Sequence, residues 1–168
     1  LHYQYDHSGA LPAFLVATEG RRHEVVVARA EVSTFPDSIY CFDGAYLNWG
    51  WLRRITDEKA FFVTRARANQ ALRFHGQQKT PKRKGVLFDM IVKTKDYYAR
   101  KDYPYPLRLI GFWDTARERY LEFLTNNFKL SAATIAEIYK ARWDIEIFFK
   151  WIKYNLKIKT FLGTSKNA

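Results

Sequence analysis

The chain has 168 residues, 48% of them hydrophobic, which is enough for one domain with a packed core and excludes an intrinsically disordered chain. Lys and Arg number 28 against 17 Asp and Glu, so the net charge of +11 favours a polyanionic partner such as DNA, RNA or anionic lipid. The single cysteine, Cys41, excludes an internal disulfide framework and a thiolate zinc cage, and it fits a reducing cytosol. No apolar run approaches the ~18–20 residues that a membrane span requires.

The first third of the chain alternates between short strands and helices. Apolar runs bounded by turn residues predict strands, and apolar residues at helical spacing predict helices. In chain order we expect strands at 1–5 and 11–18, a helix at 22–30, a strand at 38–42, a helix at 46–55 and a strand at 60–64. This alternation is typical of an α/β sheet.

The middle of the chain, residues 72–125, has no convincing helical pattern. Its strand-like runs, which prolines and a turn separate, lie at 86–94, 107–113 and 120–125. We therefore expect an antiparallel β insertion inside an α/β core. The expected boundaries are 66–128 for the insertion and 1–65 with 129–168 for the core.

The expected insertion carries most of the basic excess. From Arg65 to Lys101 there are eleven Lys and Arg residues against two Asp. The run Lys82-Arg83-Lys84 within it is expected to form a loop that contacts DNA phosphates. A solvated surface would produce the same basic run, so both explanations stay open.

A long helix is expected to begin after Ser131, a good N-cap, and to run to about Leu156. Leu130 and Ile135 stand at the spacing of a hydrophobic staple. On a helical wheel the polar side chains share a stripe roughly 80° wide beside the apolar stripe. The residues of this polar stripe are Tyr139, Arg142, Glu146, Lys150 and Lys153. Ordinary i,i+4 ion pairs of Glu146 with Arg142 and Lys150 would also explain it.

Four of these residues occur at a characteristic spacing. Tyr139, Arg142, Glu146 and Lys153 match the Y-(2)-R-(3)-E-(6)-K signature of bacterial insertion-sequence transposases of the DDE type, the insertion sequence 4 group, and the chain resembles that family. The segment Asp43-Gly44-Ala45-Tyr46 is similar to its second acidic motif. Phe61-Phe62-Val63-Thr64-Arg65 is similar to the strand that follows. The resemblance covers nearly the whole chain.

The resemblance implies an RNase-H-like mixed sheet flanked by helices, and metal-assisted phosphodiester chemistry with Mg²⁺ or Mn²⁺. Asp43 and Glu146 would be the catalytic metal ligands, because two divalent cations held by carboxylates stabilise the charge of phosphoryl transfer. Arginine binds phosphate in a bidentate manner and lysine acts as a point charge. The implied DNA-binding residues of the helix are Tyr139, Arg142, Lys150 and Lys153.

The first acidic residue of the family has no clear counterpart. It is expected on a strand upstream of Leu1, so the chain would begin after the first strand of the sheet. Asp6 is the only early alternative, and it falls in an expected turn. A chain that lacks this carboxylate is expected not to cut DNA by itself.

Two tryptophans, Trp143 and Trp113, are candidates for stacking on a base pulled from the duplex, with core packing as the alternative for each. Expected partners are transposon-end and target DNA, with a homodimer in the full-length protein, in the bacterial cytoplasm at the nucleoid. Two other functions stay open. One is a non-catalytic DNA-binding remnant or domesticated fragment, and the other is a Mg²⁺-dependent nuclease of another RNase-H-like type.

The charge pattern predicts DNA binding that is largely independent of sequence and falls linearly in log K with log salt concentration, because phosphate contacts release counterions. Replacing Lys82, Arg83 and Lys84 with Ala is expected to flatten this dependence, measured by fluorescence anisotropy. An unchanged slope would assign the loop to solvent and leave Arg142 and Lys153 as the main phosphate contacts.

Overall fold

The computed structural model describes residues 2–6, 11–16, 33–44, 47–78, 85–142, 151, 154 and 155. The described strands are β1 (His2–Asp6), β2 (Leu11–Val16), β3 (Ile39–Phe42), β4 (Phe61–Arg65), β5 (Leu72–Gln77), β6 (Val86–Thr94), β7 (Leu107–Asp114) and β8 (Arg119–Thr125). The described helices with assigned bounds are α2 (Trp49–Asp57), α3 (Tyr97–Asp102) and α4 (Ala132–Ala141). None of the helices in these ranges is long and apolar enough to span a bilayer.

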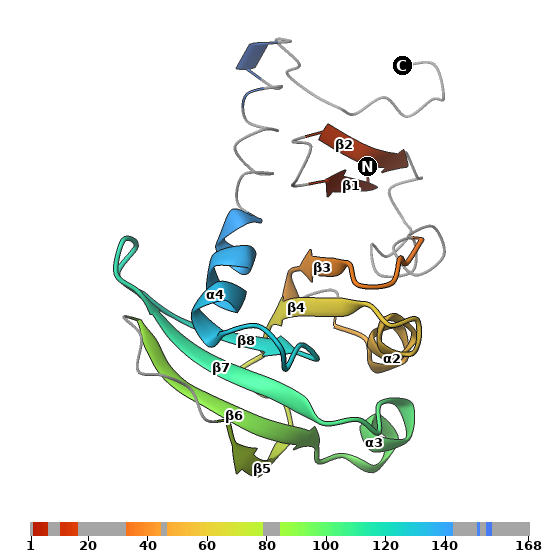
Figure 1. Ribbon diagram of the computed structural model, residues 1–168, viewed down its shortest axis with the longest axis vertical. Coiled ribbons are helices and arrows are strands. Elements are labelled where there is room, and N and C mark those ends of the chain that lie inside the picture. Colours follow the sequence, from red (N-terminus) through yellow and green to blue (C-terminus); the bar gives the residue numbers. More distant parts are fainter. Residues whose placement is uncertain are drawn as a thin grey trace.

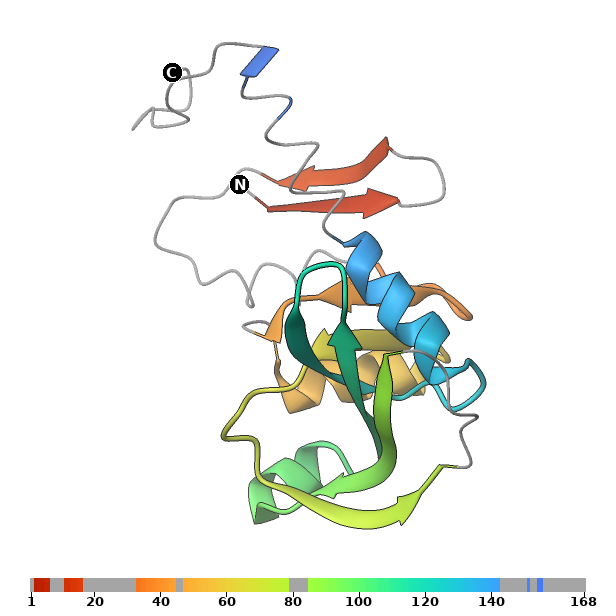
Figure 2. The ribbon, with the colours of Figure 1, turned by 90° about the vertical axis from the view of Figure 1, so that its left-hand side faces the viewer.

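Six strands form one mixed sheet in the order β3-β4-β8-β7-β6-β5, as Figure 1 shows. Strands β3 and β4 are parallel, with Ile39 opposite Phe61 and Phe42 opposite Thr64, and α2 connects them. The other pairings in the sheet are antiparallel. Strands β1 and β2 pair separately as an antiparallel hairpin, which lies beyond β3 on the side away from β5 (Figures 1 and 2). The mixed α/β class is confirmed, and the arrangement is consistent with an RNase-H-like fold.

The sheet has a hydrophobic core on each face. Adjacent residues of a strand point to opposite faces, so Phe62 and Val63 of β4 separate the two cores. Phe62 belongs to a cluster with buried residues of α2, namely Trp51, Leu52 and Ile55, and with Tyr103 after α3. Val63 belongs to a cluster with buried residues of α4, namely Ala132, Ile135, Ala136 and Tyr139. Helix α4 therefore covers one face, and α2 covers the other.

Helix α4 begins as predicted. Ser131 is its N-cap, and the hydroxyl Oγ accepts a hydrogen bond from Thr134 N at 3.1 Å. Leu130 packs against the same cluster that contains Ile135, as a hydrophobic staple requires. The helix is described as far as Ala141, and the rest of the predicted helix, apart from four positions, lies outside the described residues.

The strands predicted between residues 38 and 125 are confirmed, with ends shifted by a residue or less. The expectation of no helix in 72–125 is wrong, because α3 forms there. Its six residues are too few to show a helical period, although Asp96 caps it by accepting from Ala99 N at 3.0 Å. The predicted helix at 46–55 begins later, at Trp49, where the Asn48 side chain supplies the N-cap. The predicted helix at 22–30 lies outside the described residues.

Strand β5 was not expected, because only Leu72 and Phe74 are large apolar residues in it, which is too short an alternation to indicate a strand. It is an edge strand with mostly exposed side chains, so little burial marks it. Strand β8 pairs directly with β4, and the strands of the expected insertion therefore continue the sheet formed by β3 and β4.

The packing of α4 predicts a difference between two positions on this helix. Ile135 is fully buried, and Ile135→Ala is expected to lower the free energy of unfolding by about 2–5 kcal/mol, through lost contacts and a residual cavity. Glu137→Ala, at an exposed position of the same helix, is expected to cost about 1 kcal/mol or less. Urea denaturation measures both, and equal losses would contradict the described packing of α4.

Candidate functional site

The carboxyl ends of the two parallel strands place one acidic and one basic residue at the same edge of the sheet. Asp43 follows β3 directly, and its side chain is 50% exposed. Arg65 ends β4 and is exposed. Parallel neighbours end at one edge, and ligands commonly bind beyond the carboxyl ends of such strands. The carboxylate of Asp43 is therefore accessible to a ligand from solvent.

The end of α4 brings a second cation to this edge. Arg142 Nη2 lies 3.9 Å from Asp43 Oδ2, and the Arg142 guanidinium carbon lies 5.3 Å from the centre of the Tyr139 ring. Tyr139 is fully buried and packs on Phe123 of β8, with 4.9 Å between the ring centres. Burial is the main cause that raises the pKa of Tyr139, while Arg142 and Arg65 lower it and Asp43 raises it. These four charged or phenolic groups are thus within electrostatic reach of one another.

The segment after Asp43 is tightly held. Arg67 Nε donates a hydrogen bond to Gly44 O at 2.8 Å. A Cβ atom at position 44 would lie 2.8 Å from the backbone oxygen of Arg65, closer than real contacts allow. Glycine is therefore required for the close approach of the end of β3 to the end of β4.

Among the described residues of the site, positive charges outnumber negative ones. Arg142 pairs with the carboxylate of Asp43, Arg65 and Asp43 both act on Tyr139, and Arg67 binds the backbone oxygen of Gly44, the residue after Asp43. Guanidinium groups pair well with phosphate oxygens, so the arrangement suits a polyanion that also contacts the carboxylate through a cation. Within the described ranges, no three His, Cys, Asp or Glu side chains gather as a metal-binding group.

Cys41 lies beside the site but is not a reactive nucleophile. Its thiol donates to the backbone oxygen of Ile138 in α4, with 3.7 Å between the atoms. Burial is the main cause that raises the pKa of this thiol to about 12, and Arg142 opposes the shift. The thiolate is therefore scarce at neutral pH.

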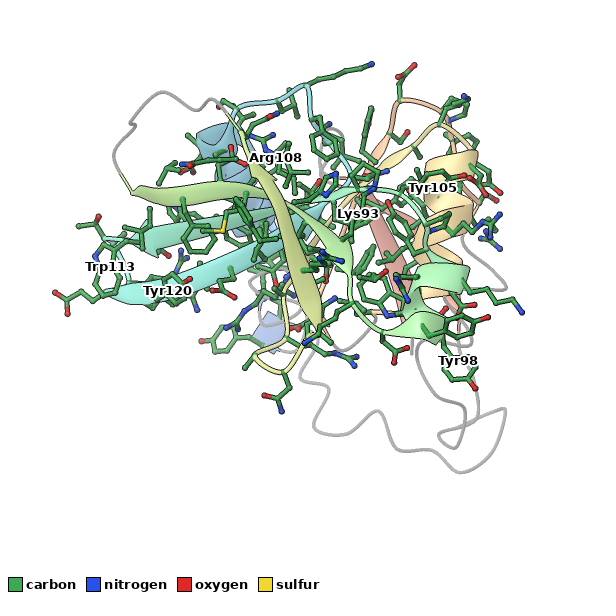
Figure 3. The ribbon with its side chains drawn as sticks, turned by 90° about the horizontal axis from the view of Figure 1, so that it is seen from below. Lys93, Tyr98, Tyr105, Arg108, Trp113 and Tyr120 are labelled. Atoms are coloured by element: carbon green, nitrogen blue, oxygen red, sulfur yellow. The ribbon has the colours of Figure 1, made fainter. Side chains whose placement is uncertain are left out.

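Of the predicted site residues, Asp43, Tyr139 and Arg142 are brought together. Trp113 lies elsewhere, at the end of β7, where it is 42% exposed and stands opposite Tyr120 of β8 (Figure 3). The predicted residues that lie outside the described part of the chain are Glu146, Lys150, Lys153, Trp143, Lys82, Arg83 and Lys84.

Sequence reasoning assigned no role to Arg65 and Arg67. The available signal was position, since Arg65 ends β4 and Arg67 follows two residues later, and β4 is the neighbour of the strand before Asp43. Arg67 was expected inside the insertion, where it counted only as part of a basic run. Its contact with Gly44 depends on the parallel pairing of β3 and β4, which the sequence pattern does not specify.

A mixed sheet with an acidic residue at the carboxyl end of a parallel strand, faced by a helix that carries arginine, is consistent with an RNase-H-like domain. The family model of the transposase DDE domain matches residues 1–168, and the chain belongs to this family.

Two relatives are similar to the chain over its whole length. The “Putative transposase y4zB” of Sinorhizobium fredii is 34% identical over 171 residues, which are 100% of this chain and 48% of the relative. The “Probable transposase for insertion sequence element IS5377” of Geobacillus stearothermophilus is 33% identical over 172 residues, 100% of this chain and 44% of the relative. The chain thus spans about half the length of these relatives. No solved structure gives a significant match.

Two glycines test the tight junction at Asp43. Gly44→Ala is expected to lower the free energy of unfolding by about 1–3 kcal/mol, because the backbone of Arg65 must move to admit the new methyl group. Gly76→Ala is the control, since a Cβ there meets its nearest atom at 3.8 Å, an ordinary contact. This control is expected to be neutral or slightly stabilising in urea denaturation. A harmless Gly44→Ala variant would show that the two strand ends are not held together.

Proposed function

We propose that this chain is part of the catalytic domain of a transposase that hydrolyses phosphodiester bonds at the ends of its insertion sequence and transfers the freed strand. The observation that carries the proposal is the position of Arg142, 3.9 Å from Asp43, at the carboxyl end of the parallel strands. Membership of the DDE family supports the same reaction. Within the family, the spacing of Tyr139, Arg142, Glu146 and Lys153 supports the insertion sequence 4 group.

Asp43 and Glu146 are the proposed metal ligands. Mg²⁺ and Mn²⁺ prefer carboxylate oxygens, and the half-exposed carboxylate of Asp43 has room for further ligands. Its pairing with Arg142 is longer than a hydrogen bond, so an oxygen of Asp43 can bind a cation without breaking a short contact. When bound, the metal ions supply charge stabilisation and activation of water.

The arginines have a separate role, which is to hold DNA phosphates. Arg142 is held over the ring of buried Tyr139, so its guanidinium keeps one position beside Asp43. Arg65 and Arg67 flank the same edge, where they neutralise the phosphate groups next to the scissile bond. Lys150 and Lys153 are proposed to extend this phosphate contact along the helix.

In the whole protein we expect one more strand and one more carboxylate at the site. Among the described strands, β3 pairs on one side only, with β4, so its other edge can accept a strand. The proposed first acidic residue lies on that strand, next to Asp43. The relatives are about twice as long as this chain, which is consistent with such a segment in the whole protein.

DNA is also proposed to contact the insertion. Trp113 and Tyr120 stand opposite each other with 42% and 44% exposure, and base–aromatic stacking would use this exposed area (Figure 3). Trp143 remains a second proposed stacking residue, and Lys82, Arg83 and Lys84 remain proposed phosphate contacts. A homodimer acting at the nucleoid in the cytoplasm completes the proposal.

A non-catalytic DNA-binding remnant is the second candidate function. The excess of arginine over carboxylate at the described site favours it, because such a surface holds phosphate without metal. The two functions differ in the effect of removing the Asp43 carboxylate. A catalytic site needs it for DNA cleavage, whereas a DNA-binding remnant does not need it.

The test uses the full-length protein and DNA that carries the ends of its own element. Asp43→Asn is expected to abolish Mg²⁺-dependent nicking while DNA affinity stays within about twofold, because the change removes a metal ligand and keeps the shape. Glu146→Gln is expected to do the same. Asp102→Asn, at an exposed position at the end of α3, is the matched control and is expected to cut normally.

Gel assays of nicking and anisotropy measurements of binding distinguish the outcomes. Full activity of the Asp43→Asn variant would refute the catalytic role of Asp43. A wild-type protein that binds the ends but never cuts them with Mg²⁺ or Mn²⁺ would support the DNA-binding remnant.

A further inference from the structure

A buried ion pair crosses two strands of the sheet, on the face that α4 covers. Asp89 of β6 and Arg108 of β7 form two hydrogen bonds, from Nε to Oδ1 at 2.7 Å and from Nη2 to Oδ2 at 2.5 Å. The side chains are 1% and 3% exposed. Such a pair loses most of its attraction to desolvation, so net stability alone is a weak reason for its presence.

The remaining nitrogen of Arg108 points to a different part of the chain. Nη1 donates to the backbone oxygens of Asn127 at 3.0 Å and Leu130 at 2.6 Å. Asp89 fixes the plane of the guanidinium, because a bidentate contact leaves it no freedom to rotate. The direction of Nη1 is therefore set by β6, and it determines where residues 127–130 lie. Figure 3 labels Arg108 within the sheet.

Residues 127–130 lead directly into α4. The Asn127 side chain accepts hydrogen bonds from Lys129 N and Leu130 N, each at 2.9 Å, which makes the segment a rigid turn. Thr125 Oγ1 accepts from Asn127 N at 3.0 Å and donates to Phe62 O at 2.5 Å, so the turn is also fixed to β4. The next residue, Ser131, caps the helix.

We propose that the Asp89–Arg108 pair is a positioning device for α4, which holds Arg142 and Tyr139 opposite Asp43. The strands β6 and β7 thereby help to set the geometry of a site that lies at the ends of β3 and β4. The inference rests on the proposed function only for what Arg142 and Tyr139 do to DNA. The placement of α4 is independent of that role.

The chain contains a natural reporter of this placement. Cys41 is its single cysteine, and the thiol lies against the backbone oxygen of Ile138 in the middle of α4. Cys41 is partly buried, and movement of α4 away from β3 exposes its sulfur further to a disulfide reagent such as 5,5′-dithiobis(2-nitrobenzoic acid). The labelling rate under native conditions therefore measures how often α4 leaves its position.

The experiment compares labelling rates of the 168-residue chain, with EDTA and without DNA, alongside urea denaturation. Arg108→Lys keeps the charge, but a single ammonium cannot serve Asp89 and both backbone oxygens. Labelling of Cys41 is expected to accelerate about tenfold or more, as the loss of charged hydrogen bonds predicts. Ile55→Val, in the core on the opposite face, is the control, and its labelling is expected to follow only its change in global stability.

The double variant Asp89→Leu with Arg108→Met separates positioning from stability. Replacing a buried ion pair with apolar residues usually preserves stability, yet no donor remains for the oxygens of Asn127 and Leu130. We expect near wild-type urea denaturation together with labelling that stays fast. If Arg108→Lys fails to fold, this double variant still tests whether the ion pair positions α4.

Wild-type labelling of the stable double variant would overturn the proposal, and so would an Arg108→Lys variant that labels no faster than its global stability predicts. Loss of DNA cleavage or binding by the full-length protein would contradict the proposed function and leave these rates unchanged, so the two failures are distinguishable.

Discussion

The parallel pairing of β3 with β4 is the constraint on which the site depends. It brings the ends of two strands to one edge, and the missing Cβ of Gly44 lets these ends approach until the backbones nearly touch. Helix α4 packs over the same pair through Val63, so its last turn comes to the same edge. Asp43 and Arg142 meet there although neither is near the other in sequence. A change in the pairing of β3 with β4 would therefore separate Asp43 from Arg142 even if every side chain stayed the same.

Many of the strands, the start of α4 and two of the site residues could be predicted from the sequence, because each depends on residues that are close together in the chain. Buried strands are short apolar runs, Ser131 is a strong N-cap, and the residue types at 139 and 142 recur at fixed spacing. Helix α3 and strand β5 could not be found in this way, since six residues show no helical period and an exposed edge strand with two large apolar residues shows too short an alternation. The contact of Arg67 with Gly44 was also hidden, because it depends on strand order rather than spacing.

The electrostatics of the site follow from the difference in burial between its members. Tyr139 lies in the core, where its ring gives Arg142 a fixed support, while Asp43 is half exposed and remains hydrated. The contact between Arg142 and Asp43 is 3.9 Å long and its carboxylate is half exposed, so it is weak and can be exchanged for stronger partners. A phosphate for the arginine and a cation for the carboxylate are such partners. The resting contact therefore keeps the two groups close without locking them together.

The continuity of the sheet changes how the β insertion should be understood. An inserted domain joined only by flexible linkers could bind DNA but could not control the site. Here β8 lies between β4 and β7, and the guanidinium of Arg108 extends the connection to the turn before α4. Protein interiors are close-packed, so a displacement of β6 and β7 moves this turn rather than being absorbed. The strands of the expected insertion therefore belong to the structural support of α4 and, through it, of Arg142.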